Sequence, residues 1–78
     1  MPTILKIKGY RFFFYVNDHS PPHIHVEKGY CTAKFFLEPP ELIKSRKFSA
    51  VEINMIRKLI VENIDLFKSK WNEFFNNN

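Results

Sequence analysis

Residues 21–27 (PPHIHVE) carry the side chains best suited to chemistry in this 78-residue sequence. Successive side chains of an extended strand point to opposite faces, so His23 and His25 are predicted to project from one face, about 6.6 Å apart. Two imidazoles at this spacing suit three roles. They can share a metal ion, act as a general acid and base, or serve as exposed polar residues of a binding strand.

A metal ion held by both histidines would need a third protein ligand. Glu27 stands about 13 Å from His23 along an extended strand, too far to join the same coordination shell. The nearby third nitrogen is His19, in the preceding loop. With one cysteine and no second histidine-rich segment, neither a metal nor another cofactor is expected.

General acid–base chemistry requires histidines that titrate near neutral pH and a cation to hold a phosphate. His23, His25 and Lys34 are therefore the catalytic candidates, with Lys34 predicted to lie opposite His23 across a hairpin. Together with Tyr15 or Tyr30 they would suffice for metal-independent cleavage of RNA through its 2′-hydroxyl. Whether the protein is an enzyme stays open, because the same residue types also suit binding alone.

Two predicted β-hairpins position these side chains. Their strands are Thr3–Ile7 with Tyr10–Val16, and His23–Glu27 with Tyr30–Glu38; the turns are Lys8-Gly9 and Lys28-Gly29. Two-residue turns fix the register, so Lys6 should face Arg11 and His25 should face Thr32.

Alternation along these strands separates an apolar core face from an open face. The core face should carry Leu5, Ile7, Tyr10, Phe12, Phe14, Ile24, Val26, Cys31, Ala33, Phe35 and Leu37. The binding candidates of the open face are Lys6, Lys8, Arg11, Phe13, Tyr15 and Tyr30. Lys6 opposite Arg11 places two positive charges together, which destabilises a bare sheet, and an anionic ligand would relieve this repulsion. Cations beside exposed aromatic rings are also how many sheets bind single-stranded RNA.

The remaining chain reads as a connector over residues 39–48 and a helix over 49–75, followed by a tail over 76–78. Glu41–Arg46 is expected to form a short helix. Ser49 and Glu52 have the spacing of a capping box, and apolar residues then recur at helical intervals. A straight helix of this length would overhang its sheet by about 16 Å, leaving Trp71 and Phe74 to cover a partner, a second copy or a folded-back loop.

Composition indicates one small domain. The net charge is +4, and all of the excess positive charge lies in residues 1–48, which contain eight lysines and arginines and four acidic residues. That half would attract an anionic partner. The single cysteine excludes an intrachain disulfide, no signal peptide or membrane-spanning segment is readable, and the expected location is the cytoplasm.

Several segments together resemble one bacterial family. They are residues 1–4 (MPTI), 9–15 (GYRFFFY), 21–26 (PPHIHV) and the helix start at Phe48-Ser49. This pattern is similar to the domain-of-unknown-function 4160 family. The resemblance implies a small partnered bacterial protein of the toxin–antitoxin type, encoded beside another small gene, and assigns no catalytic residues.

The sequence thus predicts an α+β fold, a four-stranded antiparallel meander packed on one long C-terminal helix. The leading function is a toxin–antitoxin-type module that binds RNA on the open face, with cleavage by the histidines as an extension. The alternative is a non-catalytic protein–protein interaction module, an antitoxin, adaptor or regulator that oligomerises through the sheet face or the helix end. A metal-dependent enzyme is a third hypothesis.

Overall fold

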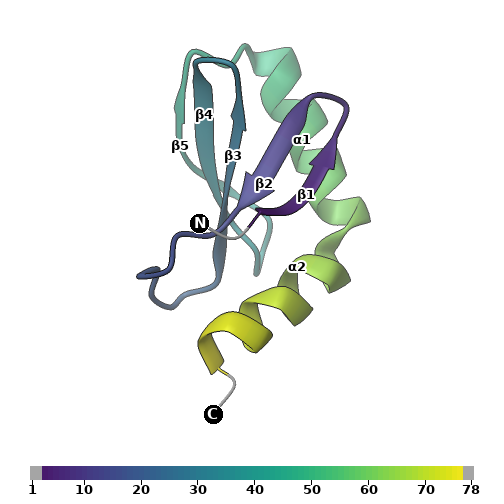
Figure 1. The fold of residues 1–78 in the computed structure, drawn as a ribbon. Coiled ribbons are helices and arrows are strands. Elements are labelled where there is room, and N and C mark those ends of the chain that lie inside the picture. The colour runs from purple at the N-terminus through teal and green to yellow at the C-terminus, as the bar shows by residue number, and fades with distance from the viewer. Residues whose placement is uncertain (1–2, 77–78) are drawn as a thin grey trace.

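The computed structural model describes residues 3–76 and forms one antiparallel sheet covered on one face by helices (Figure 1). The sheet order is β1-β2-β3-β4-β5, so each strand pairs with its neighbour in sequence. The bounds are β1 Thr3–Ile7, β2 Tyr10–Phe13, β3 His23–Lys28, β4 Cys31–Phe36, β5 Leu42–Arg46, α1 Ala50–Glu62 and α2 Ile64–Trp71, with a π-helical turn at Asn72–Asn76. The α+β class is confirmed, while the number of strands and the single helix are corrected below.

The first hairpin has the predicted register from Ile7 opposite Tyr10 to Leu5 opposite Phe12, and Lys6 faces Arg11. A bulge then places Thr3, rather than Ile4, opposite Phe13.

The second hairpin is shifted by two residues from the prediction. Gly29 and Tyr30 form its turn, with Lys28 opposite Cys31, so His25 faces Lys34 and His23 faces Phe36. The tripeptide Lys-Gly-Tyr occurs at residues 8–10 and 28–30, and its two copies form turns of different geometry. Lys8 and Gly9 both adopt positive φ at the first tip, whereas Gly29 leads the second with φ 61°.

Residues 42–46 form a strand, and the expected short helix at Glu41–Arg46 is wrong. β5 pairs with the outer edge of β4, with Thr32 opposite Arg46 and Lys34 opposite Lys44. Six residues after a proline pair offer few intrahelical hydrogen bonds, while pairing satisfies the backbone groups along an otherwise bare β4 edge. The added strand places two more cations on the sheet.

The helix begins as predicted and then bends. The Ser49 hydroxyl accepts a hydrogen bond from the backbone N–H of Glu52, and the Glu52 carboxylate accepts one from the Ser49 N–H. At Asn63 the backbone leaves helical geometry (φ −117°), and the side-chain amide donates to the Leu59 carbonyl at 2.8 Å. A polar side chain inserted into the hydrogen-bond ladder is a known cause of kinks.

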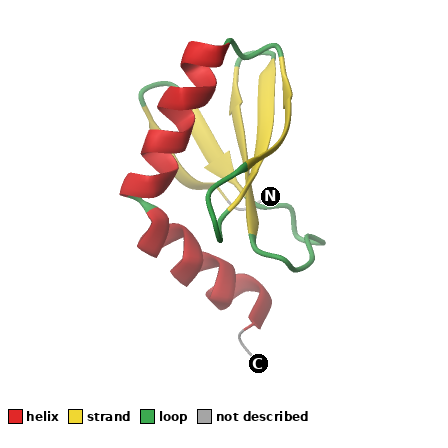
Figure 2. Ribbon diagram, turned by 180° about the vertical axis from the view of Figure 1, so that it is seen from behind, coloured by secondary structure: helices red, strands yellow, loops and turns green. Residues whose placement is uncertain are grey.

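The bend changes the direction of the predicted overhang. Viewed from behind, α2 turns away from the direction of α1 and runs past the end of the sheet (Figure 2). Phe67 and Trp71 become fully buried, packing on Phe12 and Phe14 respectively. Burying each ring contributes roughly 2–3 kcal/mol, against about 1 kcal/mol for each disrupted helical hydrogen bond, so bending is favoured.

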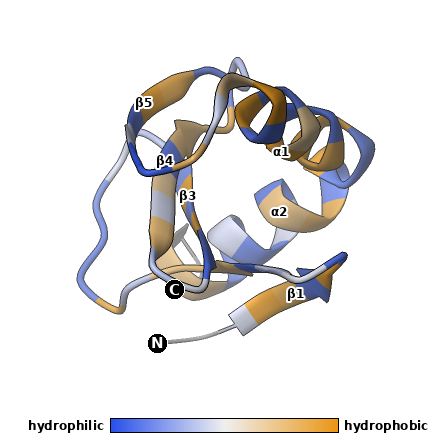
Figure 3. Ribbon diagram, turned by 90° about the horizontal axis from the view of Figure 1, so that it is seen from above, coloured by the Kyte–Doolittle hydropathy of each residue, from blue (hydrophilic) through white to orange (hydrophobic). Residues whose placement is uncertain are grey.

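The core lies between the curved sheet and the two helices, as the view from above shows (Figure 3). Most predicted core residues are buried, with Leu5 and Ile7 only partly covered and Cys31 half-buried. The buried residues that form one contacting core cluster are Tyr10, Phe12, Phe14, Ile24, Val26, Ala33, Phe35, Leu37, Ile56, Leu59, Ile60, Phe67 and Trp71. Within residues 3–76 no helix is long and apolar enough to cross a membrane. Residues 1–2 of the predicted N-terminal segment and 77–78 of the predicted tail lie outside the described part.

Candidate functional site

The loop between β2 and β3 brings an acidic side chain next to β3, the histidine strand, which carries His23 and His25. The Asp18 N–H donates to the Tyr15 carbonyl at 3.1 Å, and the Tyr15 N–H donates to Asp18 Oδ2 at 2.9 Å. This reciprocal pair closes a turn over residues 15–18, as aspartate commonly does in loops. The backbone therefore fixes the carboxylate and leaves its second oxygen, Oδ1, for other partners.

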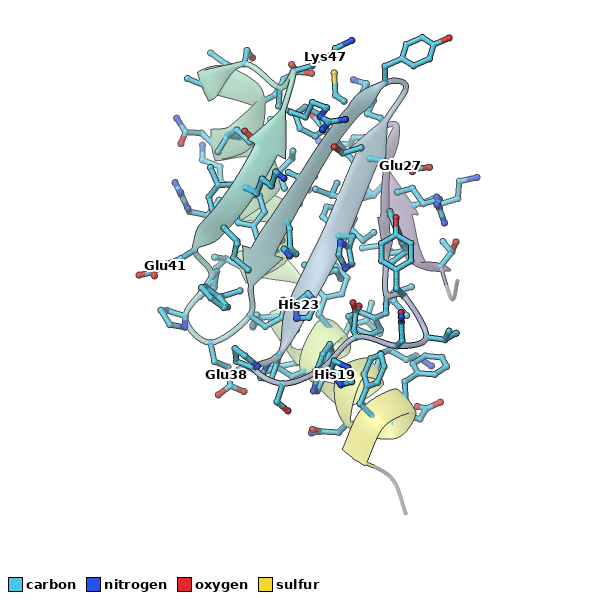
Figure 4. The ribbon with its side chains drawn as sticks, turned by 90° about the vertical axis from the view of Figure 1, so that its left-hand side faces the viewer. His19, His23, Glu27, Glu38, Glu41 and Lys47 are labelled. Atoms are coloured by element: carbon cyan, nitrogen blue, oxygen red, sulfur yellow. The ribbon has the colours of Figure 1, made fainter. Side chains whose placement is uncertain are left out.

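Asp18, His23 and His25 form a three-residue cluster. Asp18 Oδ1 lies 3.2 Å from His23 Nε2 and 3.3 Å from His25 Nε2. All three side chains are largely shielded, with 10–16% of their surface exposed. In Figure 4, His23 lies at the end of β3 beside the loop that carries His19, while Glu27 lies toward the other end of the strand.

Aromatic rings surround the cluster. The Trp71 ring lies 5.2 Å from the His23 ring, so the bent helix reaches the histidine strand directly. The His25 ring stacks on Phe13 at 5.5 Å and meets the edge of Tyr15 at 4.6 Å. Of the two residues predicted to cover a partner, a second copy or a folded-back loop, Trp71 packs on this chain's own Phe14 and His23, whereas Phe74 is 48% exposed.

The cluster shifts the pKa of two of its members. Burial lowers the pKa of His25, and the hydrogen bond and charge of Asp18 only partly oppose that shift. For Asp18, burial would raise the pKa, but the Tyr15 N–H and the two histidines outweigh it and lower the pKa. The cluster therefore favours an ionised carboxylate beside a neutral His25.

A concavity of about 310 Å³ opens on the same face, next to the cluster. Its charged and aromatic lining comprises Phe13, Tyr15, His25, Glu27, Lys34, Lys44 and Arg46. Lys34 and Lys44 lie directly opposite each other. Neither they nor Arg46 has an acidic partner among residues 3–76, whereas Glu27 is bonded to Arg11 at 2.9 Å. This concavity, called the hollow below, therefore carries uncompensated positive charge.

The predicted catalytic residues are only partly brought together. His23 and His25 share Asp18, but Lys34 lies opposite His25, not opposite His23 as expected. The two-residue register shift causes this difference. It leaves every side chain on its predicted face and moves only its cross-strand partner.

The predicted binding residues separate into several environments. Arg11 is held by Glu27 and by the Thr3 hydroxyl at 2.8 Å, so the like-charge pair with Lys6 is already compensated. Phe13 is 3% exposed, with the Arg11 guanidinium 4.1 Å above its ring.

The other binding candidates are exposed, but only one borders the concavity. Tyr15 is 41% exposed and contributes to its wall, whereas Tyr30, 89% exposed, stands at the β3–β4 turn. Lys6 and Lys8 lie on the edge strand and its turn, away from the hollow.

Sequence reasoning missed Asp18, Lys44 and Arg46. Asp18 stands beside His19, and only the loop's return brings the aspartate, rather than the histidine, onto the cluster. Lys44 and Arg46 are followed by Ser45 and Lys47, so the segment shows no alternation of apolar and polar residues that would have identified its strand.

Comparison with known proteins identifies a family. The sequence model of one protein family, a domain of unknown function (DUF4160), matches residues 9–72. No curated protein and no solved structure matches the chain.

Proposed function

Because the chain belongs to the DUF4160 family, whose function is unassigned, we propose from the site geometry that it is a binding module for single-stranded RNA. The observation that carries the proposal is the positive concavity, whose lining contains Lys34, Lys44 and Arg46 as well as Tyr15. The combination provides both elements that single-stranded RNA requires, a charged track for the backbone and a ring for a base.

The cations support a phosphate-binding role. Lys34 and Lys44 repel each other across the strand pair, at a cost of a few tenths of a kcal/mol or more. Glu27, the acidic residue of the lining, is bonded to Arg11 and does not compensate them. A phosphate between the two lysines would remove the repulsion and release bound counterions, which makes affinity depend on salt.

Tyr15 supports stacking of a base. Its ring is held by the edge of Phe13 at 5.3 Å and by His25, so little conformational freedom is lost on binding. Stacking one base on such a ring contributes roughly 1–3 kcal/mol. Thr32, which also lines the hollow, offers a hydroxyl suited to the 2′-hydroxyl that distinguishes RNA from DNA.

RNA cleavage would extend this binding. His25 and Lys34 face each other on neighbouring strands, a suitable pair for a proton transfer beside a bound phosphate. However, the Nε2 atoms of both histidines already face Asp18. Binding is therefore the central claim, and a toxin–antitoxin-type component acting on cytoplasmic RNA is the biological role it would fit.

Fluorescence anisotropy of a labelled mixed-sequence single-stranded RNA tests the proposal, at two salt concentrations with chelator present. The test variant is Lys34→Gln/Lys44→Gln, and the matched control is Lys6→Gln/Lys8→Gln, which removes the same charge outside the hollow. We expect the test variant to bind roughly 100-fold more weakly, because each charged contact contributes about 1.5 kcal/mol or more. Its salt dependence should also fall by about 1.4 in log–log slope.

Equal losses in both variants would show that overall charge, not the hollow, binds RNA. Absence of salt-sensitive binding would overturn the proposal. It would favour the alternative, a protein–protein interaction module, which sedimentation of the protein alone would then examine. Gel analysis of the same samples reports cleavage, and RNA shortened by the parent protein but not by His25→Ala would assign that activity to the cluster.

A further inference from the structure

We propose that Asp18, His23 and His25 form a binding site for one divalent transition-metal cation, with zinc as the expected occupant. Their candidate ligand atoms, one carboxylate oxygen and two imidazole nitrogens, all lie within 4.8 Å of one another. Two histidines and one carboxylate form a common donor set for zinc and for non-haem iron. The inference is independent of RNA binding, which is tested with chelator present.

The hydrogen bonding of His23 identifies the atom that faces the cation. His23 Nδ1 lies 2.9 Å from the Pro21 carbonyl, an acceptor only, so the proton of the neutral ring resides on Nδ1. The Nε2 lone pair then points at the Asp18 carboxylate, 3.2 Å away. With the ring in this neutral form the two acceptors repel each other, and a cation between them would bond to both.

The separations suit a small ion better than direct ion pairs. Charge-assisted N–H···O bonds are usually about 2.7–2.9 Å long, shorter than the distances of 3.2 and 3.3 Å found here. Ligands placed about 2.0–2.1 Å from a tetrahedral zinc ion stand roughly 3.3 Å apart. Both oxygen–nitrogen separations therefore already match adjacent corners of a zinc tetrahedron.

The ligands are also oriented by partners outside the cluster. The Pro21 carbonyl orients His23, and the Tyr15 N–H orients Asp18 through its other oxygen. Metal-binding histidines typically donate their second N–H to a carbonyl or carboxylate in this way. Phe13 and Tyr15 hold the His25 ring. Three protein ligands leave a fourth zinc position for water or for a ligand.

Isothermal titration of the chelator-treated, desalted protein with zinc chloride tests the site. We expect one zinc per chain with a Kd below roughly 1 µM. Asp18→Asn and His25→Gln should each weaken binding by at least about 100-fold, because a lost ligand costs no less than a lost supporting residue. His19→Gln is the matched control. It removes an exposed histidine of the same loop outside the cluster and should leave affinity unchanged.

Cobalt(II) absorption provides a readout that does not depend on any variant folding. An intense visible band on the parent protein would indicate a low-coordinate site built from protein ligands, whereas the weak spectrum of hydrated cobalt would overturn the proposal. Zinc at 100 times its Kd should raise the Tm by at least about 10 °C. Binding weaker than about 100 µM, or binding reduced equally by His19→Gln, would also overturn the proposal.

Discussion

Two pairs of cations face each other across strands of this sheet, and only one pair is neutralised. Lys6 and Arg11 meet on β1 and β2, where Glu27 bonds to the guanidinium. Lys34 and Lys44 meet on β4 and β5, without an acidic partner among residues 3–76. The same repulsive geometry is compensated within the fold at one side of the sheet and is left uncompensated by the described residues at the other.

Reversing one charge of the uncompensated pair should have the largest effect. Lys44→Glu places opposite charges across β4 and β5, which should stabilise the fold by about 0.2–1 kcal/mol. The same change should reduce RNA affinity by roughly 100-fold or more, since one attraction becomes a repulsion. Chemical denaturation and anisotropy measure the two effects. Lys44→Gln is the control, with a smaller loss of affinity, and RNA binding unaffected by Lys44→Glu would contradict the role of the pair.

An aromatic substitution sharpens the contrast between the hollow and the rest of the surface. Tyr15→Ala should weaken RNA binding by about tenfold, the equivalent of 1.4 kcal/mol of stacking. Tyr30→Ala removes a more exposed ring outside the hollow and should change affinity by less than about twofold. Anisotropy with the same RNA compares them, and a greater loss in Tyr30→Ala would move the binding surface to the hairpin tip.

The smallest effect should come from converting the compensated pair into an uncompensated one. Glu27→Gln removes the charge that balances Arg11 and should lower the free energy of unfolding by about 0.5–1 kcal/mol. Thermal unfolding would show this as a Tm lower by roughly 4 °C. Adding Lys6→Gln in that background should restore part of the loss. Stability unchanged by Glu27→Gln would mean that the Lys6–Arg11 repulsion is already screened by solvent.

Short-range signals predicted most of the fold. The strands before Pro39, the capping box at Ser49 and the two faces of the sheet follow from alternation and turn chemistry, and the faces survive a register shift of two residues. The strand at Leu42–Arg46 and the bend at Asn63 do not follow from such signals. Both depend on tertiary packing: the free edge of β4 and the burial of Phe67 and Trp71.

The candidate site was predictable only in part, for a related reason. His23 and His25 are found by their spacing along one strand. Asp18 belongs to the cluster because a loop returns it to that strand, and no periodicity records where a loop returns. Lys44 could be assigned to the site only if residues 42–46 were predicted as the fifth strand of the sheet.

The packing of Trp71 against His23 has a spectroscopic consequence. Trp71 is the only tryptophan of the chain, so all indole emission arises from a ring that lies 5.2 Å from the His23 ring of the cluster. Its Nε1–H is buried without a hydrogen-bond partner in the described structure, which makes the emission sensitive to any polar group that arrives there. The protein therefore carries an intrinsic fluorescent reporter whose quenching by a paramagnetic ion or whose spectral shift would follow occupancy of the histidine strand without a label.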